Sequence, residues 1–330
     1  MQKNDRGRKT ASPGFARSFR HLAKRPGGKM AKAMIGFVGI GIMGYHMARR
    51  LAENGYPIRV WNRTPDKAGR LAAFGAGVER VAVDVADAAD FVICMLSSGP
   101  VCDDILLGPN GVMAAMRPGA TLIVMSSIPV DTATRHAREA DARGIRYIDA
   151  PVSGGEKGAE AGTLAIMAGG DPDVVERARP VLEIMGRPVR IGPNGTGQLS
   201  KLVNQMMVAS TIAAVAEALL LAERGGADPA KVREALLGGF ADSTILRQHG
   251  LRMIEGNFVP GGPAKYQIKD TATAIDLAKG MNLDLPILNL VDRLFADMVA
   301  HGDGDLDHSA ILLELRRRQP VSAAPAMSKE

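Results

Sequence analysis

The spacing that most directly suggests chemistry in this sequence is that of Lys201, Asn204 and Gln205. Residues three and four positions apart are neighbours on a helix, so these side chains share one face if the segment is helical. An ammonium group can deliver a proton or stabilise negative charge on an oxygen atom. The structural alternative is a lysine that extends to solvent, although the helix dipole disfavours a cation at a helix start.

A glycine-rich loop from Asp149 to Gly158 supplies a second set of candidate groups. Consecutive glycines expose successive backbone amides, which form an anion-binding nest, and the Ser153 hydroxyl adds a donor. We therefore expect Ser153, Gly154 and Gly155 to bind a small carboxylate. A flexible glycine loop without a ligand is the alternative.

A third glycine pattern lies near the start of the chain, where the apolar run Met34–Val38 is followed by glycines and then by a helical pattern. A strand, a glycine turn and a helix in this order are typical of dinucleotide binding, because the turn admits the pyrophosphate and the helix amides face its charge. The predicted cofactor-binding residues are Gly39, Gly41, Ile42, Met43 and Gly44. A glycine turn that binds nothing is the alternative.

The choice of dinucleotide depends on the residues after the next apolar strand, Ile58–Trp61. NAD-specific sites usually have a carboxylate there, which would repel a 2′-phosphate. This chain has Asn62, Arg63 and Thr64. The Arg63 guanidinium can form two hydrogen bonds to a phosphate, and the Asn62 and Thr64 side chains can each donate one. The sequence favours NADP(H), with NAD(H) still possible. Arg63 as a solvated surface residue is the alternative.

Further strands alternate with helical patterns and predict an α/β fold with a Rossmann-type, doubly wound parallel sheet. The apolar runs Phe91–Leu96 and Thr121–Met125 each end in serines. Ligands bind beyond the carboxyl ends of parallel strands. We therefore expect four further residues to line the cofactor: Met95, Leu96, Ser97 and Ser127.

A long helix is predicted from Gly197 through Glu223, about 40 Å in length at 1.5 Å per residue. It is almost continuously apolar from Met206 to Ala222, so we expect it to be buried on most sides. Glu217 interrupts the run, which argues against a membrane span. The helical patterns that follow predict an all-α domain joined to the sheet domain through this helix. The predicted boundaries are 1–33 for a disordered basic tail, 34–196 for the dinucleotide domain, 197–318 for the helical domain and 319–330 for a frayed C-terminus.

Charge and cysteine content limit the classes of partner. The net charge is +6, yet residues 1–33 hold ten Lys or Arg and one Asp, so the remainder has 31 basic against 34 acidic residues. Nucleic-acid binding is thus expected only through the tail. Two alternative interpretations of the tail are an organellar transit peptide and residues that precede a later start codon. Cys94 and Cys102 lack metal-binding spacing and are expected to be buried thiols in a reducing, cytoplasmic environment, with no metal site.

Taken together, residues 34–316 resemble the β-hydroxyacid dehydrogenase family, which includes 3-hydroxyisobutyrate dehydrogenase and tartronate semialdehyde reductase. The resemblance implies that Lys201 is the catalytic acid/base, that Ser153–Gly155 bind the substrate carboxylate, and that Asn204 and Gln205 orient lysine and substrate. It also implies that a Lys-Asp pair, Lys269 and Asp270, lies near the cofactor. Segments around Phe240 and His308 are most similar to the tartronate semialdehyde and glyoxylate reductase branch, whose members use either cofactor. Relatives form dimers or tetramers.

The expected activity is oxidation or reduction of a small 2- or 3-hydroxy acid and its oxo acid or semialdehyde. Two alternatives to this activity are an imine reductase of similar fold and a non-catalytic NADP-binding scaffold whose basic tail binds nucleic acid. Members of both groups are expected to lack the lysine that this chain retains at position 201.

Overall fold

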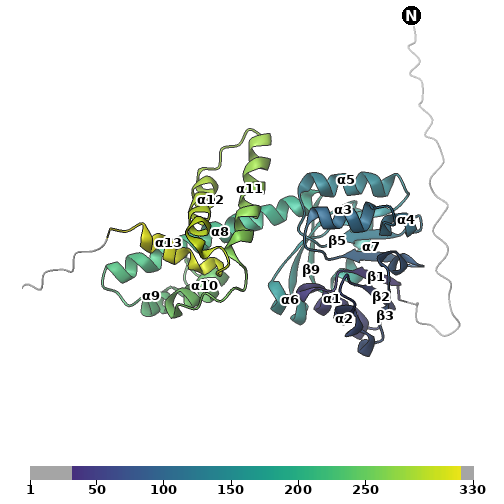
Figure 1. Cartoon of the computed structure of the whole chain (residues 1–330), viewed down its shortest axis with the longest axis horizontal. Helices are drawn as coiled ribbons and strands as arrows, with labels where there is room; N and C mark the ends of the chain where they lie inside the picture. Colours follow the sequence, from purple (N-terminus) through teal and green to yellow (C-terminus); the bar gives the residue numbers. More distant parts are fainter. Residues whose placement is uncertain (1–31, 321–330) are drawn as a thin grey trace, which may run out of the picture.

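The computed structural model describes residues 32–320 and shows a sheet domain followed by packed helices (Figure 1). The long helix α8 (Thr196–Arg224) runs from the sheet into the helical part. The predicted fold class, a Rossmann-type sheet joined to a helical domain through one long helix, is confirmed. Nearly all of the predicted basic tail and C-terminal segment lies outside the described residues, so those two predictions are not tested.

Within the described residues, one nine-stranded sheet has the order β3-β2-β1-β4-β5-β6-β8-β7, with β9 paired to β8. The strands from β1 to β6 are parallel, so their carboxyl ends meet at one edge. The bounds are Ile35–Val38 for β1, Ile58–Trp61 for β2, Gly77–Val78 for β3, Phe91–Cys94 for β4, Thr121–Val124 for β5, Arg146–Asp149 for β6, Val152–Ser153 for β7, Leu164–Gly169 for β8 and Gly186–Gly192 for β9.

The far end of the sheet differs from the expected all-parallel arrangement. Strand β8 is antiparallel to both β6 and β7, and β9 is parallel to β8. The connection from β7 to β8 holds one short helix, and a parallel crossover usually needs a dozen or more residues. Strand β7 consequently runs in the same direction as β6, which leaves the loop after Ser153 at the same edge as the other carboxyl ends.

Helices cover both faces of the sheet, and each face has its own apolar core. Ile35 and Phe37 point to the face covered by α1, α6 and α7, whereas Val38 points to the face covered by α3, α4 and α5. This alternation is the period-two pattern of a strand buried on both sides. The helix bounds are Ile42–Glu53 for α1, Pro65–Gly69 for α2, Gly99–Leu107 for α3, Val112–Ala115 for α4, Val130–Asp141 for α5, Gly155–Ala161 for α6 and Pro172–Leu182 for α7.

The remaining helices pack around the distal part of α8 (Figure 1). They are α9 (Pro229–Leu236), α10 (Thr244–Glu255), α11 (Ala264–Gly280), α12 (Pro286–Met298) and α13 (Ile311–Arg317). By length and apolar composition α8 is long enough to cross a membrane. Its buried residues pack instead with those of the neighbouring helices, where Ile212, Ala216 and Leu219 join Phe295 in one core.

The burial of α8 differs from the expectation of a helix enclosed on most sides. Val203 is 46% exposed, Met207 63% and Leu221 75%. The neighbouring helices of the same chain cover only part of its circumference, so these three apolar side chains remain on the surface. Apolar composition alone does not indicate which parts of a helix surface the rest of the chain covers.

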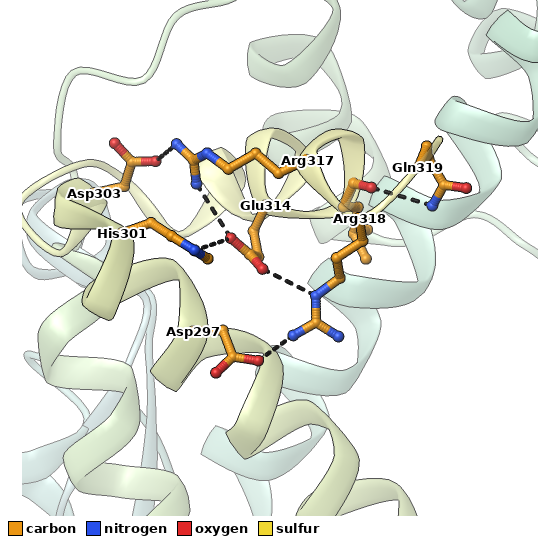
Figure 2. A network of polar contacts seen from close by, with 8 residues as sticks. Asp297, His301, Asp303, Glu314, Arg317, Arg318 and Gln319 are labelled. Carbon is orange, nitrogen blue, oxygen red and sulfur yellow. Dashed lines mark hydrogen bonds and ion pairs between the residues drawn. The ribbon is translucent and has the colours of Figure 1, made fainter. Parts of the chain in front are cut away.

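The last helix is fixed by a buried carboxylate, as Figure 2 shows. Glu314 of α13 is 1% exposed and accepts hydrogen bonds from His301 Nδ1 at 2.8 Å, Arg318 Nε at 2.9 Å and Arg317 Nη1 at 3.2 Å. The two arginines also pair with Asp303 and Asp297. These pairs hold α13 against α12 and the turn that follows it.

Candidate active site

The turn between β1 and α1 is shaped by glycines with two different roles. A Cβ atom on Gly39, whose φ is +98°, would lie 2.2 Å from the Met95 carbonyl oxygen, and one on Gly44 would lie 2.0 Å from the Gly39 oxygen. The fold itself requires both. Gly41 has φ −83° and a Cβ there would meet no protein atom within 4 Å. The open space beside Gly41 fits the close approach of a dinucleotide pyrophosphate, which Gly39, Gly41 and the first amides of α1, including Ile42 and Met43, would hold.

This difference gives a direct prediction. Replacing Gly41 with alanine is expected to leave the free energy of unfolding nearly unchanged and to weaken NADPH binding by about 10- to 100-fold, the effect of a steric overlap of about 1–3 kcal/mol. Urea unfolding and a fluorescence titration with NADPH measure the two quantities. Gly44→Ala is the matched control and should destabilise the fold. Normal NADPH affinity in the Gly41 variant would contradict a pyrophosphate at this position.

Asn62, after β2, has a more structural role than the sequence suggested. Its Oδ1 accepts the Ile40 N–H at 2.9 Å and its Nδ2 donates to the Thr64 carbonyl at 3.0 Å. It thereby joins the glycine turn to the end of β2. One of the two N–H groups of its amide is already bonded to the Thr64 carbonyl, which leaves one to donate to a 2′-phosphate. Arg63 and Thr64 are exposed, and within residues 32–320 the Arg63 guanidinium has no hydrogen-bond or ion-pair partner.

The loops after β4 and β5 lie side by side at the same edge. Met95 and Leu96 are half-buried, whereas Ser97 and Ser127 are exposed. The residue that joins these loops is Ser126, which is not among the predicted site residues: its Oγ accepts the Leu96 N–H at 2.6 Å. The predicted cofactor-lining residues are therefore held on neighbouring loops beside the glycine turn.

The glycine loop after β7 has the backbone form that an anion nest needs. Gly154 and Gly155 have φ values of +137° and +62°, which favour glycine strongly. A Cβ at Gly155 would meet no atom within 4 Å, whereas one at Gly154 would lie 3.1 Å from Leu164 Cδ2, so the space beside Gly155 is open. These three residues are available to a carboxylate at the edge that also holds the cofactor loops.

The start of α8 is inserted into the sheet edge, and Asp149 anchors it. Asp149 is fully buried at the end of β6; its Oδ1 accepts the Gly195 N–H at 2.8 Å and its Oδ2 the Gln198 N–H at 2.9 Å. A Cβ on Gly197 would lie 2.4 Å from the carbonyl oxygens of Asp149 and Met167, so only glycine permits this approach. Lys201 follows Gln198 by one helical turn, which places it close to the sheet.

Burial raises the pKa of the Asp149 carboxyl to about 6, although the hydrogen bonds from Gly195 and Gln198 act in the opposite direction. Because this folded pKa exceeds the unfolded value near 3.9, Asp149 contributes stability below about pH 4 that is lost as the pH rises through 6. The free energy of unfolding of the wild type minus that of Asp149→Asn should fall by about 2 kcal/mol between pH 4.5 and 7. Urea unfolding at the two pH values measures it, and a difference that stays constant or grows would contradict the assignment.

Lys201 is half-buried and has a carboxylate nearby. Burial lowers the pKa of its ammonium group, and the charge of Asp270 on α11 partly offsets that effect. Asp270 Oδ2 accepts a hydrogen bond from Gln205 Nε2 at 2.6 Å, and Gln205 Oε1 accepts one from Asn204 Nδ2 at 2.9 Å. The amide pair predicted to orient the lysine is thus connected to the carboxylate that influences its charge.

Other predicted features are less well placed by the structure. Lys269 is exposed, and no contact among the described residues joins it to the glycine turn, so its cofactor role stays a prediction. Cys94 and Cys102 are buried free thiols, as expected. Within residues 32–320, no group of three His, Cys, Asp or Glu side chains is arranged to hold a metal ion.

Two further buried polar residues, Asp149 and Gln198, have structural roles that local sequence patterns did not indicate. Both could have been noticed: one is a charged residue that ends an apolar strand, and the other is an amide between the glycine start of α8 and Lys201. Their partners are backbone groups far away in the sequence, which no local pattern identifies.

Known proteins resemble this chain over most of its length. Residues 34–195 match the family described as the NAD binding domain of 6-phosphogluconate dehydrogenase, and residues 195–315 match the NAD-binding domain of NADP-dependent 3-hydroxyisobutyrate dehydrogenase. The chain is 44% identical over 283 residues to 2-hydroxy-3-oxopropionate reductase of Escherichia coli, covering 85% of this chain and 96% of that protein. It is 37% identical to a probable 3-hydroxyisobutyrate dehydrogenase-like protein of Arabidopsis thaliana, covering 87% and 86%.

A solved structure, that of 3-hydroxyisobutyrate dehydrogenase from Mycobacterium tuberculosis with L-serine, superimposes with a TM-score of 0.79. That protein is 33% identical to this chain, and the match covers 86% of this chain and 99% of the other. The similarity therefore includes both the sheet domain and the helical domain.

Proposed function

This chain belongs to the 3-hydroxyisobutyrate dehydrogenase-like family of NAD(P)-dependent hydroxyacid oxidoreductases, and from that premise we propose that it reduces a small oxo acid or semialdehyde with Lys201 as proton donor. The observation that carries the proposal is the placement of Lys201, which is half-buried and lies one turn beyond the junction of α8 with the sheet edge. A scaffold without catalysis, or an imine reductase, agrees less well with the presence of this lysine and with the named activities of the relatives.

The proposed reaction adds a hydride and a proton to one carbonyl group. A bound reduced nicotinamide would supply the hydride to the carbonyl carbon, leaving the oxidised dinucleotide and a hydroxy acid. Ser153 and the amides of Gly154 and Gly155 bind the substrate carboxylate. The Lys201 ammonium stabilises the negative charge that develops on the carbonyl oxygen and transfers its proton to that oxygen. In the oxidative direction neutral Lys201 accepts the proton of the substrate hydroxyl group. The lowered pKa of Lys201 favours this neutral form.

We propose NADP(H) as the preferred cofactor. The support is the exposed Arg63 guanidinium beyond β2, together with an amide rather than a carboxylate at position 62. A cation at this edge attracts a 2′-phosphate, whereas the carboxylate typical of NAD-specific sites would repel it.

Among substrates, we propose 2-hydroxy-3-oxopropionate or glyoxylate as the first candidates, because the E. coli relative is named for the former. The decisive experiment assays 2-hydroxy-3-oxopropionate, glyoxylate, succinic semialdehyde and methylmalonate semialdehyde, each with NADPH and with NADH. The expected result is measurable turnover of at least one of these carboxylates, fastest with NADPH. The absence of turnover with all four would contradict the proposed substrate class.

We also propose that the chain forms a homodimer or homotetramer through its helical part. Val203, Met207 and Leu221 on α8 and Ile287 on α12 are exposed apolar side chains, and such residues are typical of surfaces that a second copy covers. Sedimentation velocity is expected to show a species of at least twice the mass of the chain, 34.8 kDa. A monomer at micromolar concentration would contradict this proposal.

A further inference from the structure

The Gln198 side chain bridges α8 to the loop after β5. It is 1% exposed, its Oε1 accepts the Ile128 N–H at 3.1 Å, and its Nε2 donates to the Ser126 carbonyl at 2.8 Å. These two bonds fall on either side of Ser127, a predicted cofactor-lining residue. A buried amide that satisfies both its donor and its acceptor on one loop fixes that loop in position and orientation.

Ser126 extends the same connection to the loop after β4. While its carbonyl accepts from Gln198, its hydroxyl oxygen accepts the Leu96 N–H at 2.6 Å. A continuous hydrogen-bonded path thus leads from the β4 loop through Ser126 and Gln198 into α8. Both loops in this path carry predicted cofactor-lining residues, and they follow β4 and β5, on the opposite side of β1 from β2 and Arg63.

The helix that receives this path has little freedom to shift. The Gln198 N–H is bound to Asp149, and Gly197 is in close contact with the backbone of β6 and β8. Lys201 lies three residues beyond Gln198, about 4.5 Å along the helix axis and nearly on the same side. Any displacement of Gln198 therefore moves Lys201 with it.

We propose that Gln198 is a positioning residue that sets the distance between the cofactor-lining loops and the Lys201 ammonium. The inference rests on the proposed function, in which the cofactor and Lys201 act on the two atoms of one carbonyl bond, about 1.2 Å apart. Hydride and proton must then arrive at fixed, mutually consistent positions, and a misplacement of about 1 Å can cost about 100-fold in rate.

The test compares Gln198→Met with Asn194→Ala. Methionine keeps the length and volume of glutamine and removes both hydrogen bonds. Asn194 is an amide at the same junction that donates to the Tyr147 carbonyl at 3.0 Å and has no bond to the loops after β4 and β5, so its variant is the matched control. Both variants lose amide-to-backbone bonds at the start of α8, and urea unfolding records the effect of each on stability.

For Gln198→Met we expect kcat to fall about 10- to 100-fold with less than about a 3-fold change in the KM for NADPH. The primary isotope effect on kcat with 4-deuterated NADPH should rise, because misaligned hydride transfer becomes slower than product release. Asn194→Ala should keep the wild-type kcat and isotope effect within about 2-fold. A folded Gln198→Met enzyme with wild-type kcat and isotope effect would overturn the proposal, as would equal losses of kcat in both variants.

If Gln198→Met does not fold, Gln198→Asn is the second variant, because it keeps a buried amide that is one methylene too short to reach both the Ile128 N–H and the Ser126 carbonyl. The same fall in kcat and rise in isotope effect are expected, and wild-type values of both would overturn the proposal. Failure of the proposed function is recognised separately: in that case the wild-type protein does not oxidise NADPH with any of the four substrates, or Lys201→Met does not lower its turnover.

Discussion

Replacing Lys201 with methionine is expected to lower kcat by about 10²- to 10⁴-fold in both reaction directions while NADPH still binds with wild-type affinity. The side chain keeps its approximate length, so packing at the start of α8 is preserved. What is lost is the proton donor and the positive charge beside the developing oxyanion. Steady-state kinetics and a fluorescence titration with NADPH measure the two effects.

Lys231→Met is the control for the loss of a lysine, since Lys231 lies 75% exposed on α9 and pairs with Glu234. It should have wild-type turnover. A Lys201→Met enzyme with a rate within a few-fold of the wild type would contradict the mechanism. Loss of NADPH binding in this variant would assign the lysine to the cofactor instead of to the substrate.

The pH dependence of turnover provides a second measurement on the same lysine. Asp270 raises the pKa of Lys201 through its charge, and burial lowers it. In Asp270→Asn the pKa of Lys201 should therefore fall further. The reductive rate needs the ammonium and should begin to decline at a lower pH than in the wild type, whereas the oxidative rate needs the neutral amine and should reach its maximum at a lower pH. Profiles that move to higher pH would contradict this assignment.

The second large effect is expected at Arg63. Replacing it with alanine should lower the ratio of kcat/KM for NADPH to kcat/KM for NADH by about 10- to 100-fold, because charge-assisted hydrogen bonds to the 2′-phosphate are worth about 1.5–3 kcal/mol. The kcat/KM for NADH should change little. The double variant Arg63→Ala, Asn62→Asp should have a still lower ratio, since a carboxylate repels the 2′-phosphate and binds the ribose hydroxyl of NAD.

Arg70→Ala distinguishes direct contact from a general effect of positive charge. The Arg70 guanidinium lies 4.1 Å from the centroid of the Tyr45 ring, so it already has a partner within the protein. The cofactor ratio should remain close to the wild-type value in this control. An unchanged ratio in Arg63→Ala would remove the basis for the NADP preference.

Local patterns in the sequence were sufficient for much of the fold. Gly39 and Gly44 must be glycine, because a Cβ atom at either position would overlap a backbone carbonyl oxygen. The strand–turn–helix order of the sequence placed both correctly after β1. The helix that begins beside Gly197 was predicted to within a residue at each end, because no proline or glycine interrupts it until Gly225. The antiparallel direction of β8 was missed, since an apolar run has the same pattern in either direction.

The sequence by itself determined which chemical groups this protein has: a dinucleotide turn, a glycine nest beside Ser153, and a lysine with two amides at the root of an apolar helix. Only the tertiary structure decided how these groups are held. The buried carboxylate of Asp149, the bridging amide of Gln198 and the charge of Asp270 act on atoms more than 40 residues away in the chain. Periodicity and motif spacing describe neighbours along one element, whereas the pKa of Lys201 and its distance from the cofactor loops depend on elements that meet only after folding.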